Sequence, residues 1–522
     1  MKYLLLVLLI LPTLVGAVTP GKPVLTKEGV LSGLILDEES GLEVFRGVRY
    51  AEPPLKELRW KPPVPVQTWR GLKMCQLFSP IAPQNVNKGV REHQSEDCLF
   101  LNIWTTKTNQ PDAKLPVMVW IHGGGLNRGW GHKEFYDGSA FAERGVVLVS
   151  INYRLGALGF LSHPALSAES DQGVSGNYGI LDQIEALRWI ARNIASFGGD
   201  PDNVTIFGES AGGTSVSVLC SSPLAQGLFH KAIIQSPWMF GYIDKLAEPN
   251  FAHLSQPYWN LPSAEELGVE WASKHTDDTG ATGLEALRAL PFPEVVKTVG
   301  YYRTRPTVDG WILPGHPQTI FSEGKQADIP VIVGTTKDEG NYFSGFVNYE
   351  KRSEFEEKLE NFYGPNAKKV LKIYPGETKQ ELKAAGSEFV TDAWFVQPAR
   401  QLLDGMTQLS SSVFQYQFSR GYPNNPKLGA PHAIELRYVF NTLKNPDENP
   451  ESQVLADQVT DYWIQFAKTG DPNRDGLPEW PSYSMKKRAY LDLDVQVTTG
   501  VDLKKEASDA LDQATKALYS VQ

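Results

Sequence analysis

Short, almost continuous apolar segments recur through the middle of the chain and end at glycine or polar residues. The clearest are residues 117–121, 146–151, 204–207, 232–234 and 330–333. A strand buried on both faces of a sheet has this composition, because neither face needs a polar side chain. Residues 182–194 carry apolar side chains at helical spacing, and residues 210–220 are also compatible with a helix. The alternation predicts an α/β fold with a mostly parallel central sheet.

Two long segments, residues 245–325 and 350–410, interrupt this alternation and are richer in charged and helix-forming residues. Open α/β sheets bind ligands at the carboxyl ends of their strands. We therefore interpret both segments as insertions that cover this edge of the sheet. Further strands are predicted over 30–36, 43–48, 413–418 and 489–493, and a helix over 454–467. Because no Gly/Ser-rich linker interrupts the chain, we expect residues 18–522 to form one domain.

The first 17 residues have a different pattern. Lys2 precedes an apolar run from Tyr3 to Leu11, and small residues follow at positions 15–17. This three-part layout is typical of a secretory signal peptide, and the run is too short to span a bilayer. The sequence thus predicts a signal peptide over residues 1–17 and a periplasmic or extracellular protein. No later apolar run is long enough for a membrane span.

Charge and cysteine content narrow the possible partners. The chain carries 60 acidic and 50 Lys or Arg residues, a net charge of −10, which argues against a nucleic-acid partner. The three cysteines, Cys75, Cys98 and Cys220, lack the spacing of a zinc site, so no metal is expected. In an oxidising compartment one disulfide can form, and sequence proximity favours Cys75 with Cys98. Cys220 lies in an apolar stretch and is predicted to be a buried free thiol.

The segment Gly208-Glu209-Ser210-Ala211-Gly212 carries the sharpest chemical signal. It follows the strand predicted over 204–207 and opens a predicted helix. A G-x-S-x-G segment in this context forms a nucleophile elbow, a sharp turn that exposes the serine at its tip. The pattern therefore predicts Ser210 as a nucleophile, which needs a neighbouring base to accept its proton.

A second motif, His122-Gly123-Gly124-Gly125, directly follows the strand predicted over 117–121. Residues without a Cβ allow backbone N–H groups to approach a substrate closely. We expect Gly124, Gly125 and Ala211 to donate these groups to the oxyanion of an acyl-transfer reaction. We call residues 122–125 the glycine loop.

The base must be a histidine that follows Ser210, because this fold orders its triad as Ser, acid, His. His432, in a loop after the strand predicted over 413–418, is better placed than four other histidines, His230, His253, His275 and His316. The acid is expected in the loop after the strand at 330–333. Asp338 and Glu339 both lie there, and the residues themselves do not decide between them.

Taken together, these motifs resemble the type-B carboxylesterase and cholinesterase family over nearly the whole chain after the signal segment. The resemblance is carried by residues 45–54, 95–104, 152–156, 197–201, 337–340 and 432–435, together with the glycine loop and the elbow. It implies an α/β-hydrolase fold, hydrolysis of a small-molecule carboxylic ester, and no cofactor. It also implies a triad of Ser210, Glu339 and His432, so that Glu339 and not Asp338 is the acid.

The resemblance assigns several supporting residues as well. It places Glu209 and Ser236 beside the triad, pairs Cys75 with Cys98 in a disulfide, and implies an Arg46–Glu96 ion pair. The sequence departs from the cholinesterases because no tryptophan lies between Cys75 and Cys98, which argues against acetylcholine as the substrate.

Arg128 and Trp130 follow the glycine loop, where the family often has small residues. They either contact the substrate, with Arg128 favouring an acidic or polar group, or form a solvated arginine and a packed tryptophan. We favour the second interpretation because arginine is usually exposed. Two other functions use the same fold: a catalytically silent binding module, which the intact triad argues against, and an amidase, thioesterase or lipase. The sequence does not identify the natural ester.

Overall fold

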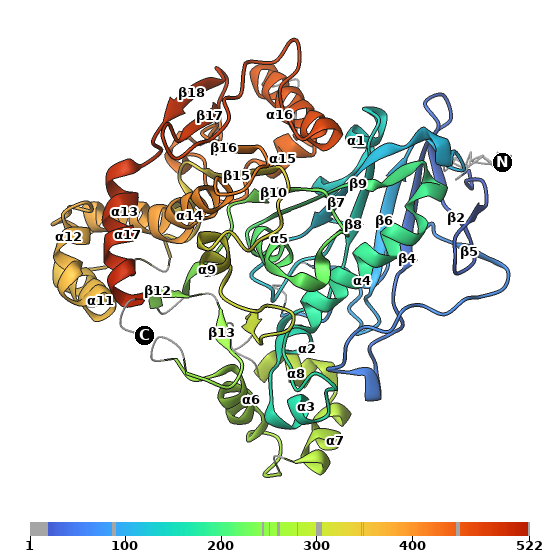
Figure 1. The fold of residues 1–522 in the computed structure, drawn as a ribbon, viewed down its shortest axis with the longest axis horizontal. Helices are drawn as coiled ribbons and strands as arrows, with labels where there is room; N and C mark the ends of the chain where they lie inside the picture. The colour runs from blue at the N-terminus through green and yellow to red at the C-terminus, as the bar shows by residue number, and fades with distance from the viewer. Residues whose placement is uncertain are drawn as a thin grey trace, which may run out of the picture.

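The computed structural model describes residues 19–85, 90–242, 245–249, 251–257, 261–278, 280–298, 305–345, 347, 349–444 and 449–519. The predicted signal peptide, residues 1–17, lies outside the described residues. Within them, eleven strands form one large sheet with helices on both faces (Figure 1). No described helix has both the length and the apolar character needed to cross a bilayer.

The sheet is parallel in its centre and antiparallel at its edges. The parallel part runs in the order β8 (Val147–Ile151), β7 (Leu115–Ile121), β9 (Gly199–Glu209), β10 (Lys231–Gln235), β15 (Val331–Thr336), β16 (Val413–Phe418) and β17 (Ala489–Leu493). Antiparallel neighbours extend it: β18 (Thr498–Val501) beyond β17, and β6 (Phe100–Thr105), β4 (Leu42–Arg49) and β3 (Leu34–Asp37) beyond β8. The predicted mostly parallel sheet is confirmed.

The central strands are apolar throughout because two separate cores cover the two faces of the sheet. Along β7, Val117 and Val119 face one core, whereas Met118 and Trp120 face the other. The first core includes α4 (Tyr178–Asn193) and α5 (Ala211–Ser221), and the second includes α16 (Pro450–Thr469). All three helices were predicted from the sequence, with ends that differ by a few residues.

Both interrupting segments contain several helices, as predicted, and the first also contains three short strands, β12 (Lys245–Pro249), β13 (Ala252–His253) and β14 (Thr307–Val308). The first contains α6 (Ala264–Ala272), α7 (Ala281–Ala289), α8 (Phe292–Thr298) and α9 (Pro317–Ser322). The second contains α11 (Arg352–Tyr363), α12 (Ala367–Leu371), α13 (Lys379–Val390) and α14 (Gln397–Met406). Figure 1 shows α11, α12 and α13 grouped with the C-terminal helix α17 (Lys505–Tyr519) at one end of the molecule, and α6, α7 and α8 grouped elsewhere.

The predicted Cys75–Cys98 disulfide is absent: both residues, like Cys220, are buried free thiols. Cys75 extends a small separate sheet, where its amide donates to the Ser32 carbonyl at 2.7 Å and its carbonyl accepts from Arg46. Cys98 instead borders a small cavity that also contains Pro83. Burial raises the pKa of the Cys75 thiol to about 12, so it stays protonated at neutral pH.

The predicted ion pair between Arg46 and Glu96 is also wrong. Glu96 pairs with Arg59, whose Nε lies 2.7 Å from Glu96 Oε2. The Arg46 guanidinium lies over the Phe78 ring, 4.7 Å from its centroid. The register between β4 and β6 shifts between Phe45 and Val48, next to Arg46, and the resemblance gave no sign of this irregularity.

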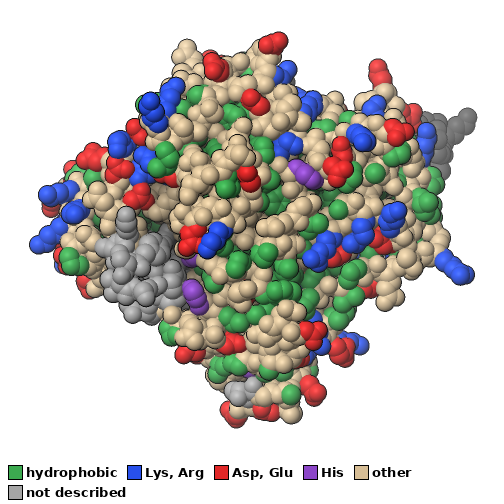
Figure 2. Space-filling model, in the orientation of Figure 1, with side chains coloured by type: hydrophobic (Ala, Val, Ile, Leu, Met, Phe, Trp, Pro, Cys, Tyr) green, Lys and Arg blue, Asp and Glu red, His purple; other side chains and the backbone are tan. Residues whose placement is uncertain are grey.

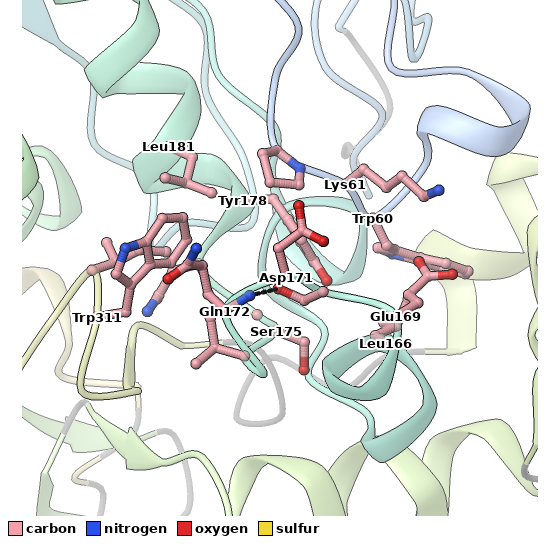
Figure 3. A pocket seen from close by; sticks show the side chains of 16 residues that line it. Trp60, Lys61, Leu166, Glu169, Asp171, Gln172, Ser175, Tyr178, Leu181 and Trp311 are labelled. Atoms are coloured by element: carbon pink, nitrogen blue, oxygen red, sulfur yellow. Dashed lines mark hydrogen bonds between the residues drawn. The ribbon is translucent and has the colours of Figure 1, made fainter.

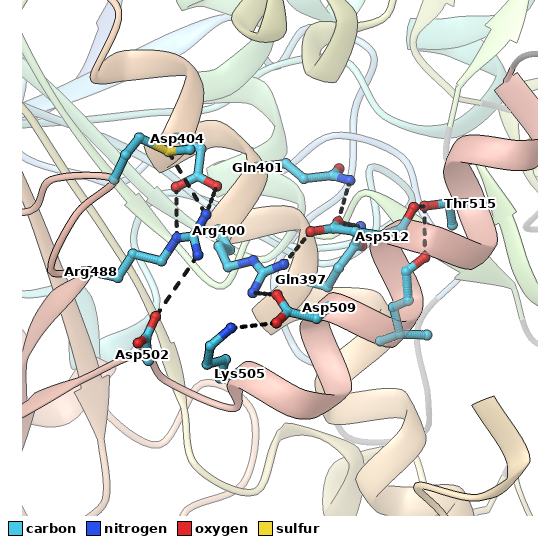
Figure 4. A network of polar contacts seen from close by, with 12 residues as sticks. Gln397, Arg400, Gln401, Asp404, Arg488, Asp502, Lys505, Asp509, Asp512 and Thr515 are labelled. Carbon is cyan, nitrogen blue, oxygen red and sulfur yellow. Dashed lines mark hydrogen bonds and ion pairs between the residues drawn. The ribbon is translucent and has the colours of Figure 1, made fainter. Parts of the chain in front are cut away.

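A polar network attaches α17 to the body of the protein (Figure 4). The Arg400 guanidinium, on α14, bonds to the carboxylates of Asp509 and Asp512, with Nη1 2.8 Å from Asp509 Oδ1. Its side chain is only 6% exposed, whereas both carboxylates are about one-third exposed. Lys505 also reaches Asp509 but lies at the surface.

We expect Arg400→Ala to lower the free energy of unfolding by roughly 2 kcal/mol, because a buried cation that holds two carboxylates is lost. Lys505→Ala is the matched control, and its exposed pair should contribute less than about 1 kcal/mol. Urea denaturation of both variants measures the difference. Equal losses from the two variants would contradict a dominant role for Arg400.

Charged side chains of both signs are spread over the face shown in Figure 2 rather than gathered into one basic patch.

Candidate active site

Ser210 lies at a strained turn between β9 and α5. Its φ is +58° and its ψ is −123°, a conformation that costs a non-glycine residue energy and persists only where the surroundings enforce it. The flanking glycines make the turn possible. A Cβ on Gly212 would lie 2.1 Å from the Ile121 carbonyl oxygen, and one on Gly208 would lie 2.6 Å from the Gly212 backbone. The predicted elbow geometry is therefore present.

His432 is held by Glu339. Nδ1 of the imidazole lies 2.5 Å from Glu339 Oε2. The other carboxylate oxygen accepts hydrogen bonds from the Ser236 hydroxyl at 2.5 Å and the Thr336 amide at 2.8 Å. Glu339 is fully buried, so these contacts fix its position and, through it, the orientation of the imidazole. His432 comes from the loop between β16 and α15 (Leu436–Val439), as predicted.

Asp338, the alternative acid, binds the backbone of the loop that carries His432 and does not contact the imidazole. Its Oδ2 accepts the Ala430 amide at 2.8 Å, and its own amide donates to the Ala430 carbonyl at 3.0 Å. Asp338 thus anchors the loop that carries His432, whereas Glu339 contacts the imidazole. Both acids therefore help to position His432: Asp338 holds the backbone of its loop, and Glu339 contacts the imidazole.

Glu209 approaches the imidazole from the other side. Its Oε1 lies 3.0 Å from His432 Nε2, and both side chains are buried. Burial alone would lower the pKa of His432, but the negative charges of Glu209 and Glu339 outweigh burial and raise this pKa well above its usual value. The pair of carboxylates therefore stabilises an imidazolium.

A third buried acid, Glu435, lies near this group. Its Oε1 accepts a hydrogen bond from the Gln235 side-chain amide at 3.1 Å. Burial, with help from the negative charges of Glu209 and Glu339, raises its pKa to about 8. The neutral form of Glu435 is therefore favoured, which limits the negative charge around His432.

The glycine loop lies against the elbow. A Cβ on Gly123 would lie 2.5 Å from the Glu209 carbonyl oxygen, so only glycine permits this contact. Gly124 and Gly125 both have positive φ, +114° and +62°. Among the described residues no acceptor is found for their amides, and Ala211 is the first residue of α5, where helix amides also lack partners. The glycine loop and Ser210 border the same cavity, whereas Ala211 is not among its lining residues.

This cavity has a volume of about 310 Å³ and brings the predicted residues together. Ser210, His432, Glu209, Gly124 and Gly125 all line it. Arg128, which is exposed as expected for a solvated arginine, and the half-buried Trp130 line it as well. Aromatic rings form much of the remaining wall: Phe135, Tyr136, Trp238, Tyr342 and Phe343.

A second hollow, of about 440 Å³, lies elsewhere (Figure 3). It is bordered by Trp60, Tyr178, Trp311 and several polar residues, and none of Ser210, Glu339 and His432 lines it. We therefore place the chemistry in the smaller cavity at the elbow.

Sequence reasoning missed Lys133, which lines the cavity, and the buried Glu435. It named Asp338 as a candidate acid but missed its role as an anchor of the His432 loop. Lys133 belongs to a short segment with Trp130, Phe135 and Tyr136, directly after the glycine loop. Because Lys133 follows the glycine loop closely in the sequence, it could have been predicted to lie near the site. Glu435 lies three residues after His432, but its burial is visible only in the folded chain.

Comparison with known proteins identifies the family. The sequence model of the Carboxylesterase family matches residues 21–511. The chain belongs to this family. It is therefore a carboxylic-ester hydrolase, and its sheet and helices are those of the α/β-hydrolase fold.

Individual relatives agree with this assignment. The chain is 34% identical to fumonisin B1 esterase of Sphingopyxis macrogoltabida over 92% of this chain and 88% of that protein. It is 33% identical to para-nitrobenzyl esterase of Bacillus subtilis, over 91% of this chain and 95% of that protein. A solved structure of PNB esterase superimposes with a TM-score of 0.80 at 31% identity, covering 94% of this chain and 99% of that one.

We expect Glu209→Gln to lower the pKa of His432, because the variant removes one of the two negative charges that raise it. An NMR titration of the His432 imidazole signals measures this shift. Glu134→Gln, at an exposed carboxylate, is the control and should leave the titration unchanged. An unchanged His432 pKa in Glu209→Gln would show that Glu209 does not act on the imidazole.

Proposed function

We propose that the protein hydrolyses carboxylic esters through an acyl-enzyme formed on Ser210, with His432 as general base and acid and Glu339 as its partner. The observation that carries this proposal is the convergence of a strained Ser210, a Glu339-held His432 and the glycine loop on one cavity. These three parts come from distant segments of the chain. A purely structural role would not require all of them to line one cavity.

The contacts of His432 indicate which nitrogen takes up and returns the proton. Glu339 favours a proton on Nδ1, so Nε2 is the nitrogen that exchanges protons on the cavity side. To act as the base, neutral Nε2 must turn from Glu209 Oε1, 3.0 Å away, to the Ser210 hydroxyl. Nε2 takes the proton of the Ser210 hydroxyl as Oγ bonds to the ester carbonyl carbon. His432 then returns this proton to the leaving alcohol as the ester C–O bond breaks. Water repeats the sequence, releases the carboxylic acid and regenerates Ser210.

The developing oxyanion needs donors that are already in place. The amides of Gly124, Gly125 and Ala211 fit this role because they belong to the glycine loop and the first turn of α5, beside Ser210. Glu209 and Glu339 stabilise the imidazolium that forms in the same step. Ser236 supports the triad through its hydrogen bond to Glu339.

The positive charges that line the cavity also indicate which esters can bind there. Arg128 and Lys133 line it, so a quaternary ammonium would meet two like charges there. We infer that choline esters are not substrates, although several aromatic rings are present. A catalytically silent binding module would have no need for the buried Glu339–His432 contact, which favours the enzymatic proposal.

We expect Ser210→Ala to reduce the hydrolysis of 4-nitrophenyl butyrate by about ten-thousand-fold or more, since the triad residues act as a unit. The kcat of purified protein measures the loss. Ser221→Ala, on the same helix α5 and bonded to the Ser217 carbonyl, is the control and should retain activity. Substantial turnover by a folded Ser210→Ala variant would rule out the acyl-enzyme.

A further inference from the structure

Lys133 places a cation among aromatic rings in the wall of the catalytic cavity. Its Nζ lies 5.2 Å from the ring centroid of Trp130, 5.8 Å from that of Phe135 and 5.7 Å from that of Tyr136. All three rings line the cavity that contains Ser210. The ammonium is therefore close to the position where an ester must bind.

This cation has no counter-ion of its own. Among the described residues, no carboxylate oxygen lies within 4.0 Å of Lys133 Nζ. Burial lowers the pKa of Lys133, and the charge of Glu209 acts against that effect. Glu209, however, is already engaged, because its carboxylate lies 3.0 Å from His432 Nε2. Aromatic rings compensate a buried ammonium only in part, whereas a carboxylate would do so directly.

The carboxylates around Lys133 lie mostly on its other side. Lys133 also borders a neighbouring cavity, whose lining includes Glu92, Glu134 and Asp137 beside the basic residues Arg46, His93 and His132. On the catalytic side, Glu209 is the one acid among the described lining residues, and its carboxylate is paired with His432. Lys133 and Arg128 are therefore left without a paired carboxylate among the described residues that line this cavity.

Arg128 adds a second cation at the rim. Its side chain is exposed, and its Nη2 lies 3.4 Å from the hydroxyl of Tyr342, another residue of the cavity wall. A guanidinium in this position can attract an anion from solvent, and the more enclosed ammonium can hold it.

We propose that the catalytic cavity selects esters that carry a free carboxylate, with Lys133 as the principal counter-ion and Arg128 as a second one at the entrance. This inference rests on the esterase function proposed above and names its substrate class. The recognised group is a carboxylate on either the acyl or the alcohol part of the ester.

Two matched substrate pairs test the inference. Mono-4-nitrophenyl adipate and 4-nitrophenyl hexanoate share a leaving group and differ by a carboxylate on the acyl part. Acetyl esters of 4-hydroxybenzoate and 4-hydroxybenzamide differ by a carboxylate on the alcohol part. We expect the wild-type protein to prefer the anionic member of at least one pair in kcat/KM. Lys133→Met should reduce turnover of that member by about tenfold, as for a lost charge-assisted contact, and change the neutral member little.

Two further variants control for structural effects. Lys133→Arg keeps the charge and should retain the anionic preference. Lys73→Met removes another lysine that lies over a tryptophan, with Nζ 3.9 Å from the Trp69 ring, but lies outside the cavity and should change nothing. A preference for the neutral member of both pairs, or an equal loss for both members in Lys133→Met, would overturn the inference.

A binding measurement separates this inference from the proposed function. Ser210→Ala cannot form an acyl-enzyme, so calorimetry can compare its affinity for monomethyl adipate and methyl hexanoate without turnover. Tighter binding of the adipate ester, weakened by adding Lys133→Met, would support the carboxylate site even if the proposed mechanism failed. Equal binding of both esters, with neutral esters hydrolysed by the wild type, would overturn the carboxylate site and leave the esterase proposal intact.

Discussion

The site depends on a close backbone contact between the elbow and the strand that leads into the glycine loop. Gly212 packs against the Ile121 carbonyl, and Gly123 packs against the Glu209 carbonyl, at distances that leave no room for a Cβ. These contacts join β7, β9 and α5 into one rigid unit. Because Ser210 and the loop amides belong to this unit, their relative positions do not depend on flexible side chains.

The electrostatics of the site build on this rigid unit. Glu209 precedes Ser210 in the elbow and so reaches His432 from one side, while Glu339 reaches it from the other. Two carboxylates around one imidazole raise the pKa of His432 and so favour its cation, the form that the proposed acyl transfer requires it to take. The raised pKa of Glu435 favours the neutral form of a third acid and so limits the negative charge near His432.

The wall of the cavity adds what the triad does not provide, namely discrimination between esters. Its aromatic rings supply apolar contact area, and Lys133 and Arg128 supply positive charge. Relatives that act on different esters share the fold over nearly their whole length. Differences in substrate therefore have to arise from side chains such as these, which line the cavity without taking part in the proton transfers.

The sequence by itself determined the features that depend on local backbone requirements. Buried strands need apolar runs, the elbow needs Gly208 and Gly212, and the glycine loop needs residues without a Cβ, so each leaves a local signature. Contacts between distant segments leave none. The residues themselves left Asp338 and Glu339 open, and only the tertiary structure showed the different contacts of these two acids. It also left Cys75 and Cys98 as free thiols and placed Lys133 in the wall of the cavity that contains Ser210. These outcomes were decided by loop paths and packing, because side chains far apart in the chain interact only after the backbone has brought them together.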